Sequence, residues 1–468
     1  MREGEQIIIL GSGSTAFAAA LRAQAKGARP IMIERSVLGG TCINWGCIPS
    51  KTLIHAALFR HQARLGERLG LGTRSGAVLF PLLDARKFEV VRELRQSKYL
   101  NVLEKVPGLT LLKGNAVFLG PDSIQVGDSI LQGNKFLIAT GGNPRIPAIA
   151  GLDQIPYLTS KSALLLKTLP ESLTILGGGV IALELGQMFL RLGVPVRVLE
   201  HGDRLLPGVE AEPAQALQEA LAAEGMEIVV GATVCSVSSH EGAVRIEAQV
   251  DGVPRRFMAQ QLLLAVGTAP ASSGIGLDRA GVELDARGFI KVDQQLRTST
   301  PGIWAAGDVT GRMQIATVGA REGIAAVDNM LENECHCALD YNSIPMAIFT
   351  DPEVGTVGYS EEAARRAGFE VICNTIQASS IPKSHVTGEL RGAIKIVAEK
   401  GSGRILGVHL CLHRGADIIN EAALAVRLNM TVGQLAETLH VYPSMGEGLR
   451  LCAQGFDRDL ERLSCCAE

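Results

Sequence analysis

The chain has 468 residues, of which 47% are hydrophobic and 20% charged, and its formal net charge is −3 with a sequence pI near 6.3. This weakly acidic balance argues against nucleic acid or an anionic membrane surface as a partner. Glu184 interrupts the most hydrophobic stretch, so no apolar run is long enough to span a membrane, and the first strand begins too early to leave room for a signal peptide. We therefore expect a cytoplasmic protein of about three domains, whose ten cysteines are mostly reduced.

The first predicted element is a buried strand over residues 6–10, which leads into the glycine-rich turn Gly11-Ser-Gly13-Ser-Thr-Ala16. An alanine-rich helix follows, and the next strand ends in Glu34. Strand–turn–helix units of this kind bind dinucleotides. The glycines let the backbone approach a pyrophosphate at the helix N-terminus, and the acid hydrogen-bonds a ribose hydroxyl.

Two cysteines five positions apart, Cys42 and Cys47, lie where the next helix is expected to begin. On an ideal helix, five residues give a rise of about 7.5 Å and a turn of about 140°, which a disulfide cannot span. We expect Gly40 and Gly46 to let this segment unwind. Lys51 lies one helical turn beyond Cys47 and brings a cation close to its sulfur. A nearby cation lowers the pKa of a thiol, so the pair is predicted to be redox-active rather than a structural disulfide.

A second glycine-rich turn, Gly177-Gly-Gly179, joins a strand over residues 173–176 to a helix, and the strand that follows ends in Glu200. In both units the acid lies 23 residues after the first glycine. The chain is therefore predicted to bind two dinucleotides. A carboxylate at Glu200 favours a free ribose 2′-hydroxyl and hence NADH over NADPH. NADPH stays open because three cations lie nearby: Arg197, His201 and Arg204.

These motifs, together with Ala139-Thr140-Gly141 and Gly302-Ile-Trp-Ala-Ala-Gly307-Asp308, resemble those of the flavoprotein disulfide reductases over essentially the whole chain. The resemblance implies an α/β fold like that of glutathione reductase, with two Rossmann-like dinucleotide-binding domains and a C-terminal α+β dimerisation domain. Its implied layout is FAD binding by residues 1–150 and 270–338, NAD(P)H binding by 151–269, and homodimer formation through 339–468.

The same resemblance implies roles for individual residues. Lys51 and Glu184 match an ion pair that the family places beside the flavin, and a buried acid needs such a partner. The implied FAD site consists of Gly11, Gly13, Ala16, Glu34, Thr41, Lys51, Thr140, Gly141 and Asp308. The implied NAD(P)H site consists of Gly177, Gly179, Glu184 and Glu200.

Near the C-terminus, family members that reduce organic disulfides carry a His-Pro pair, but this chain has Tyr442-Pro443, with His440 two residues earlier. With an ordinary pKa near 10, tyrosine is a poor proton shuttle at neutral pH. The sequence therefore argues against glutathione, lipoamide or trypanothione as the substrate. The last residues include Cys465 and Cys466, which are adjacent and suit a soft metal better than a disulfide.

Together these features resemble the mercuric reductases within the family. The resemblance implies that Hg(II) arrives as a small-thiol complex, is captured by the C-terminal cysteine pair of the partner subunit and is then reduced to Hg(0). The implied metal ligands are Cys42, Cys47, Cys465 and Cys466, and the implied active-site tyrosines are Tyr99 and Tyr442. The tyrosines could instead be packing aromatics. Two other functions stay open: a thioredoxin-reductase-like disulfide reductase and a non-catalytic metal-binding flavoprotein.

Overall fold

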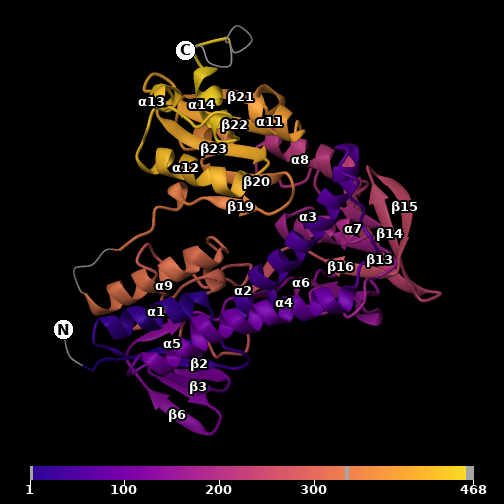
Figure 1. Cartoon of the computed structure of the whole chain (residues 1–468). Coiled ribbons are helices and arrows are strands. Elements are labelled where there is room, and N and C mark those ends of the chain that lie inside the picture. Colours follow the sequence, from indigo (N-terminus) through magenta and orange to yellow (C-terminus); the bar gives the residue numbers. More distant parts are fainter. Residues whose placement is uncertain (1–3, 333–336, 460–468) are drawn as a thin grey trace.

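The computed structural model describes residues 4–332 and 337–459. Figure 1 shows a lower region that contains α1 and α9, a region at the right that contains α7, and an upper C-terminal region that contains α12, α13 and α14. Two five-stranded parallel sheets are followed in the chain by a five-stranded antiparallel sheet. This confirms the expected fold class, whereas the exact domain boundaries stay predictions. Within the described residues, no helix combines the length and apolar character that crossing a membrane requires.

The first sheet has the strand order β18-β7-β1-β2-β3, with all neighbours parallel. Its strands are largely apolar because both faces of the sheet are covered. Helices α1 and α9 pack on one face, and the antiparallel strands β4 (Ala116–Gly120), β5 (Ser123–Val126) and β6 (Ser129–Gln132) pack on the other. Helix α9 lies beside α1 (Figure 1), and the approach is so close that a Cβ on Gly323 would lie 2.4 Å from the carbonyl oxygen of Thr15. The elements are β1 (Gln6–Leu10), β2 (Arg29–Glu34), β3 (Thr110–Lys113), β7 (Phe136–Ile138), β18 (Ile303–Ala305), α1 (Ser14–Ala25) and α9 (Ala316–Leu331).

The second sheet repeats this plan with the order β12-β11-β10-β16-β9. Helix α7 follows β10, and the antiparallel meander β13-β14-β15 packs its apolar residues against the sheet. The elements are β9 (Leu158–Thr159), β10 (Leu173–Leu176), β11 (Val196–Leu199), β12 (Glu227–Val229), β13 (Ala232–His240), β14 (Ala243–Val250), β15 (Val253–Ala259), β16 (Gln261–Leu264), α6 (Ser160–Ala163), α7 (Val180–Arg191) and α8 (Ala211–Ala223).

The C-terminal sheet is antiparallel, in the order β19-β20-β23-β22-β21. Helix α12 packs on β20, where a Cβ on Gly355 would lie 2.8 Å from Cβ of Ile419. The elements are β19 (Met346–Ile348), β20 (Glu353–Gly358), β21 (Val371–Gln377), β22 (Ala393–Glu399), β23 (Ile405–Leu412), α10 (Glu361–Arg366), α11 (Pro382–Thr387), α12 (Gly415–Arg427), α13 (Val432–Glu437) and α14 (Glu447–Gln454).

A run of helices between β2 and β3 crosses from the first sheet to the second and positions the cysteine pair. In Figure 1, α3 extends from the region of α2 toward α7. These helices are α2 (Gly40–Trp45), α3 (Cys47–Arg68), α4 (Phe80–Arg95), the π-helix η1 (Gln96–Leu100) and α5 (Asn101–Lys105). Smaller strands are β4 (Ala116–Gly120), β5 (Ser123–Val126), β6 (Ser129–Gln132), β8 (Gly142–Pro144) and β17 (Thr268–Pro270).

Candidate active site

The two cysteines of the predicted redox pair lie on either side of a break between two helices. Cys42 is in α2, and Cys47 is the first residue of α3. Gly46 separates the helices with φ −119° and ψ −111°, outside the helical region. A Cβ on Gly46 would lie 3.0 Å from the carbonyl oxygen of Thr41. The expectation that this segment departs from an ideal helix is therefore confirmed.

Both cysteines are free thiols in this structure. The hydrogen bond from Cys42 and the positive charge of Lys51 lower the pKa of Cys47 to about 7, against the opposing effect of burial. Donating that hydrogen bond, together with burial, raises the pKa of Cys42 far above its ordinary value. Cys47 is thus the more acidic thiol of the pair and is about half ionised at pH 7, whereas Cys42 keeps its proton.

The expected ion pair between Lys51 and Glu184 is present. Lys51 Nζ lies 2.5 Å from Oε2 of Glu184, whose side chain is only 5% exposed. The other carboxylate oxygen of Glu184 accepts a hydrogen bond of 2.9 Å from the backbone N–H of Phe349. The ring of Phe349 also faces Lys51, with Nζ 4.8 Å from its centroid. Thus α3, α7 and the segment that follows β19 meet at this point.

Tyr99 lies close to the cysteines on the π-helix η1. Its ring packs edge-on against Phe17 at 4.8 Å, and a Cβ on Gly39 would lie 3.5 Å from it. Burial, with a further contribution from the two neighbouring cysteines, raises the pKa of Tyr99, so the phenol stays protonated and can donate a hydrogen bond. Single π-helical turns are frequent at functional sites.

Four further side chains hold the cysteine segment, and the sequence analysis missed them. Asn44 donates a hydrogen bond of 2.8 Å to the carbonyl oxygen of Gly40 and accepts one of 3.1 Å from Arg95. Lys161 places its Nζ 3.9 Å from the ring centroid of Trp45. Asn44 itself could have indicated this arrangement from the sequence. Asparagine is unfavourable inside a helix unless its side chain hydrogen-bonds to nearby backbone groups.

The two glycine-rich turns have the same geometry. Gly11 has φ +113°, and a Cβ there would lie 2.4 Å from the carbonyl oxygen of Ala139. Gly177 has φ +103°, and a Cβ there would lie 2.5 Å from the carbonyl oxygen of Ala265. In each copy the turn is therefore restricted to glycine by the end of the neighbouring parallel strand.

Each turn leads into a helix whose first N–H groups have no side-chain cap. The N-cap of α1 is Gly13 and that of α7 is Gly179, and neither can accept a side-chain hydrogen bond. Ala16, in the first turn of α1, is fully buried. Uncapped N–H groups at a helix N-terminus are suited to a phosphate oxygen.

The two acids at the strand ends are fixed by nearby donors. Glu34 accepts hydrogen bonds of 2.6 Å from the hydroxyl of Ser12 and 2.6 Å from the N–H of Ser36. Glu200 accepts a bond of 2.6 Å from the N–H of Gly202 and another from the N–H of Gly178. Each carboxylate is thereby held against its own glycine-rich turn.

The residues expected to contact the flavin fit a polar ligand beside the first turn. Thr140 has a buried hydroxyl with no hydrogen-bond partner among the described residues. Gly141 follows it with φ +75°, and a Cβ on Gly142 would lie 3.5 Å from Cβ of Asp308. Burial raises the pKa of Asp308. The Thr140 hydroxyl and the buried Asp308 carboxyl both need hydrogen-bond partners. A hydroxyl-rich group such as the FAD ribityl chain would supply them. Thr41, on α2, is exposed.

Asp308 is held in place by a buried acid that the sequence analysis missed. Glu322 on α9 is fully buried and accepts a hydrogen bond of 2.6 Å from the N–H of Gly307. It also accepts one of 2.5 Å from the hydroxyl of Tyr341. The sequence could have indicated this residue, because Glu322 lies among small residues on the buried side of α9. A buried carboxylate needs hydrogen-bond donors.

Tyr442 does not reach the cysteine pair within the described part of one chain. It lies between α13 and α14, which Figure 1 shows well separated from α2, and 49% of its surface is exposed. Both ring nitrogens of His440 are engaged elsewhere, 2.8 Å from Oε1 of Glu421 and 2.9 Å from the carbonyl oxygen of Thr438. The predicted metal ligands Cys465 and Cys466 lie outside the described residues. Across residues 4–332 and 337–459, no group of three or more His, Cys, Asp or Glu could hold a metal ion.

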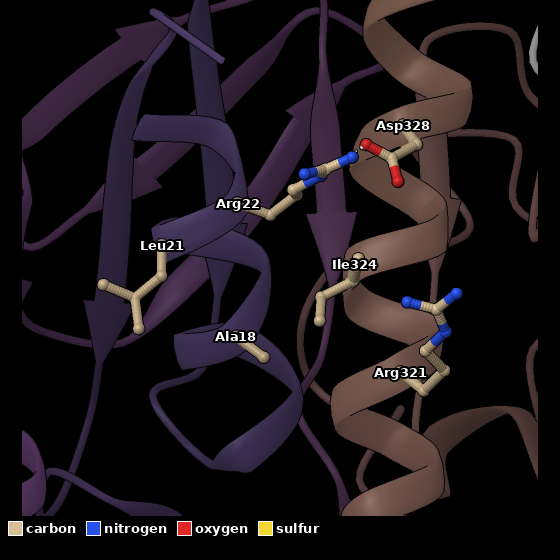
Figure 2. Close-up of a pocket in the computed structure, with 6 residues that line it drawn as sticks. All are labelled: Ala18, Leu21, Arg22, Arg321, Ile324 and Asp328. Carbon is tan, nitrogen blue, oxygen red and sulfur yellow. Dashed lines mark hydrogen bonds and ion pairs between the residues drawn. The ribbon is translucent and has the colours of Figure 1, made fainter. Parts of the chain in front are cut away.

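A surface hollow of about 490 Å³ lies between α1 and α9 (Figure 2). An ion pair of 2.6 Å between Arg22 and Asp328 closes one end of it. None of its lining residues belongs to the predicted sites. The lining consists of Ala18, Leu21, Arg22, Arg321, Ile324 and Asp328.

The sequence matches the pyridine nucleotide-disulphide oxidoreductase family over residues 5–323 and the dimerisation domain of that family over residues 344–453. The chain belongs to this family. Mercuric reductases from Acidithiobacillus ferrooxidans, Bacillus cereus and Streptomyces lividans are 40%, 38% and 38% identical to it. The alignments cover 98%, 98% and 99% of this chain and 84%, 73% and 98% of those proteins.

Solved structures give the same family. The HOCl-induced flavoprotein disulfide reductase RclA from Escherichia coli superposes with a TM-score of 0.85 at 31% identity, over 96% of this chain and 99% of that chain. LpdA from Mycobacterium tuberculosis superposes with a TM-score of 0.85 at 28% identity, over 97% and 99%. The chain is thus a flavoprotein oxidoreductase that uses FAD and a pyridine nucleotide, and its dimerisation domain supports a homodimer.

Proposed function

We propose that this protein reduces Hg(II) to Hg(0) with electrons from NAD(P)H. The observation that carries the proposal is the Cys42–Cys47 pair at the break between α2 and α3, with Lys51 of α3 paired to Glu184 beside it and Tyr99 nearby. Relatives that are 36–40% identical and named mercuric reductases support the choice of metal.

We assign FAD binding to residues 1–150 and 270–338, and NAD(P)H binding to residues 151–269. The FAD-binding residues would be those around Gly11, Thr140 and Asp308. When bound, FAD supplies two-electron transfer from the nicotinamide to the cysteine pair and to a metal held there. Lys51 offers its positive charge to this site, and Glu184 holds Lys51 in place.

The cysteines would take mercury by ligand exchange. Cys47, as a thiolate, displaces one small thiol from a bis-thiolate Hg(II) complex. Cys42 displaces the second, and its proton leaves with that thiol. Each exchange replaces one Hg–S bond by another, so free Hg(II) is not formed. Two electrons then convert the held Hg(II) to Hg(0), which binds thiolate weakly and leaves both sulfurs ionised.

Delivery to this pair is assigned to the partner subunit of a homodimer. Cys465 and Cys466 of the C-terminal tail would collect Hg(II) from thiol complexes in solution and pass it to the partner's redox pair. Tyr442 would reach the same site from the partner subunit, where its hydroxyl and that of Tyr99 contact the metal during transfer.

NADH is the expected electron donor. The carboxylate of Glu200 is fixed beside the glycine-rich turn, where it would repel a ribose 2′-phosphate. Two cations that could attract that phosphate are already engaged. Arg197 pairs with Glu227 at 2.8 Å, and Arg204 donates hydrogen bonds to backbone carbonyls, among them that of Val209 at 3.0 Å.

A second candidate is reduction of a protein or small-molecule disulfide, because the structural neighbours include a flavoprotein disulfide reductase, RclA. In that case the C-terminal cysteines would carry electrons to a disulfide substrate. Tyr442 favours mercury reduction over this second candidate. Thiol–disulfide exchange needs a proton shuttle, and a phenol is a poor one at neutral pH.

The test is nicotinamide oxidation by the holoenzyme, with Hg(II) supplied in excess small thiol and Hg(0) trapped from the gas phase. Oxidation matched by Hg(0) release, abolished in Cys47→Ser and weakened in Cys465→Ala/Cys466→Ala, is the expected result. Exposed Cys235→Ser is the matched control and should behave as the parent protein. Turnover of a disulfide without any Hg-dependent oxidation would assign the chain to the second candidate.

A further inference from the structure

The short 3-10 helix η4 (Tyr341–Ser343) connects the region of the first sheet to the C-terminal sheet through two tyrosine hydroxyls. On one side, Tyr341 donates its hydroxyl to Oε1 of Glu322 on α9 at 2.5 Å. On the other side, Asn342 donates its side-chain amide to the hydroxyl of Tyr359, the residue after β20, at 2.7 Å. Figure 1 shows α9 in the lower region and β20 in the upper C-terminal region. One three-residue element therefore bonds both parts of the chain.

The acceptor of the Tyr341 hydroxyl is a fully buried carboxylate. The second oxygen of Glu322 accepts the N–H of Gly307 at 2.6 Å. Burial and the nearby Asp308 raise the pKa of Glu322, whereas its two hydrogen bonds and the charge of Arg312 lower it. A buried carboxylate is costly unless donors and a positive charge compensate it. Each of these groups therefore offsets part of the cost of burying Glu322.

Arg312 also contacts the hydroxyl of Tyr341. Its Nη1 lies 3.3 Å from the phenol oxygen, and its Cζ lies 5.6 Å from the centroid of the ring. Its Nη2 donates to the carbonyl oxygens of Val292 and Asp293, at 3.0 Å and 2.8 Å, which hold the guanidinium in place. Because a guanidinium can only donate, the phenol oxygen accepts from Arg312 and its own proton is available to Glu322. Burial and the bond to Glu322 raise the pKa of Tyr341 to about 12, so the hydroxyl keeps that proton.

The other oxygen of Glu322 leads to the turn that carries Asp308. Gly307 in this turn has φ +77°, and a Cβ there would lie 2.5 Å from Oγ1 of Thr15 on α1. Its carbonyl oxygen accepts the N–H and the hydroxyl of Thr310, both at 2.9 Å. Since its N–H binds Glu322, both polar backbone groups of Gly307 are fixed. Asp308 follows directly, so its position depends on Glu322.

We propose that Tyr341 is a positioning residue for FAD that acts through Glu322. Its hydroxyl holds the Glu322 carboxylate in place, Glu322 holds Gly307, and Gly307 sets the position of Asp308. FAD retention is thereby tied to the seating of η4, and so to the contact between the first sheet and the C-terminal sheet. The proposal rests on the proposed assignment of Asp308 to the FAD site, and it is independent of mercury.

The test measures the dissociation constant of FAD from the holoenzyme, read from the rise in flavin fluorescence as the protein is diluted without mercury. Tyr341→Phe keeps the ring and removes only the hydroxyl. We expect about tenfold weaker FAD retention, because the buried carboxylate loses one of its two donors. Tyr359→Phe is the matched control. It removes a hydroxyl that binds the same helix η4 but does not contact Glu322, so FAD retention should equal that of the parent protein.

A second background separates the role of the carboxylate from a general loosening of η4. Glu322→Gln keeps an oxygen that can accept the Gly307 N–H but carries no charge. Hydrogen bonds between neutral groups are about half as strong as those to a charged group. In Glu322→Gln, the further change Tyr341→Phe should therefore weaken FAD retention about threefold instead of tenfold. A tenfold effect in this background would overturn the proposal.

Two other results would also overturn the proposal. One is an equal loss of FAD in Tyr341→Phe and Tyr359→Phe. The other is a lower unfolding temperature in Tyr341→Phe with an unchanged FAD dissociation constant, which is the signature of a purely structural role. If Tyr341→Phe does not fold, Arg312→Met removes the charge beside the phenol, and about threefold weaker retention is expected, with unchanged retention as the contrary result. Failure of mercury reduction would leave these FAD measurements intact, so the two proposals fail separately.

Discussion

Removing the hydrogen bond from Cys42 should make Cys47 a much weaker nucleophile at neutral pH. That hydrogen bond is the largest of the effects that lower the pKa of Cys47 from 9.0 to about 7. At pH 7 a thiol of pKa about 7 is half ionised, whereas one of pKa 9.0 is about 1% ionised, a difference of about 50-fold. Because Lys51 still acts in Cys42→Ala, we expect a loss of at least about tenfold.

The assay is the rate of iodoacetamide reaction at Cys47 in the reduced protein at pH 7, read from the modified peptide. Cys42→Ser is the matched control, because a serine hydroxyl can still donate a hydrogen bond to the Cys47 thiolate. It should therefore react nearly as fast as the parent protein, while Cys42→Ala falls behind. Equal rates in all three proteins would refute the reasoning and leave Lys51 and the start of α3 as the source of the acidity.

Three other outcomes are expected. Glu322→Ala should weaken FAD retention about tenfold, as a fluorescence titration measures, because the Gly307 N–H then loses its acceptor; unchanged retention would separate Glu322 from the flavin site. Lys395→Met should cost about 3–5 kcal/mol in urea unfolding, because three carboxylates lose their buried partner; a cost below 1 kcal/mol, as for surface pairs, would contradict this. Finally, although burial opposes it, the nearby His413 and the guanidinium of Arg191, which donates to the Asp351 carboxylate at 2.8 Å, lower the pKa of Asp351 to about 2. The resulting stability of about 2 kcal/mol is present above the unfolded pKa and should be lost as pH falls from about 4 to 2, but not in Asp351→Asn.

The parts of the site that follow from local spacing could be predicted from the sequence. The break at Gly46 follows from the five-residue separation of two cysteines that must meet, and each glycine-rich turn follows from its place between a strand and a helix. These two features depend on chain geometry within a single supersecondary unit. The Lys51–Glu184 ion pair joins residues that are 133 apart in the chain, and it was predicted from the family resemblance instead.

The parts that depend on distant contacts could not be predicted. Gln187 and Asp351 are 164 residues apart, and Glu322 bonds Gly307 only after α9 has packed against the first sheet. The π-helical turn that carries Tyr99 also lacks a local signal, because it continues α4 without a change in sequence character. Polar residues within apolar helices were visible in the sequence, but their partners were not.

The duplicated nucleotide units differ in what their helices do, and this difference explains where the reacting centre lies. In both copies the glycine-rich turn is followed by an acid at the end of the next strand. Gly11 and Gly177 both have positive φ, and a Cβ on either would collide with the carbonyl oxygen just after a neighbouring strand. Helix α1 is rich in alanine and packs closely on α9, so it serves the first sheet alone. Helix α7 instead carries buried polar side chains. Glu184 pairs with Lys51 of α3, and Glu184 and Gln187 both accept backbone N–H groups of the segment after β19. The electrostatics of the cysteine pair are therefore decided where three parts of the chain meet, beyond either nucleotide motif.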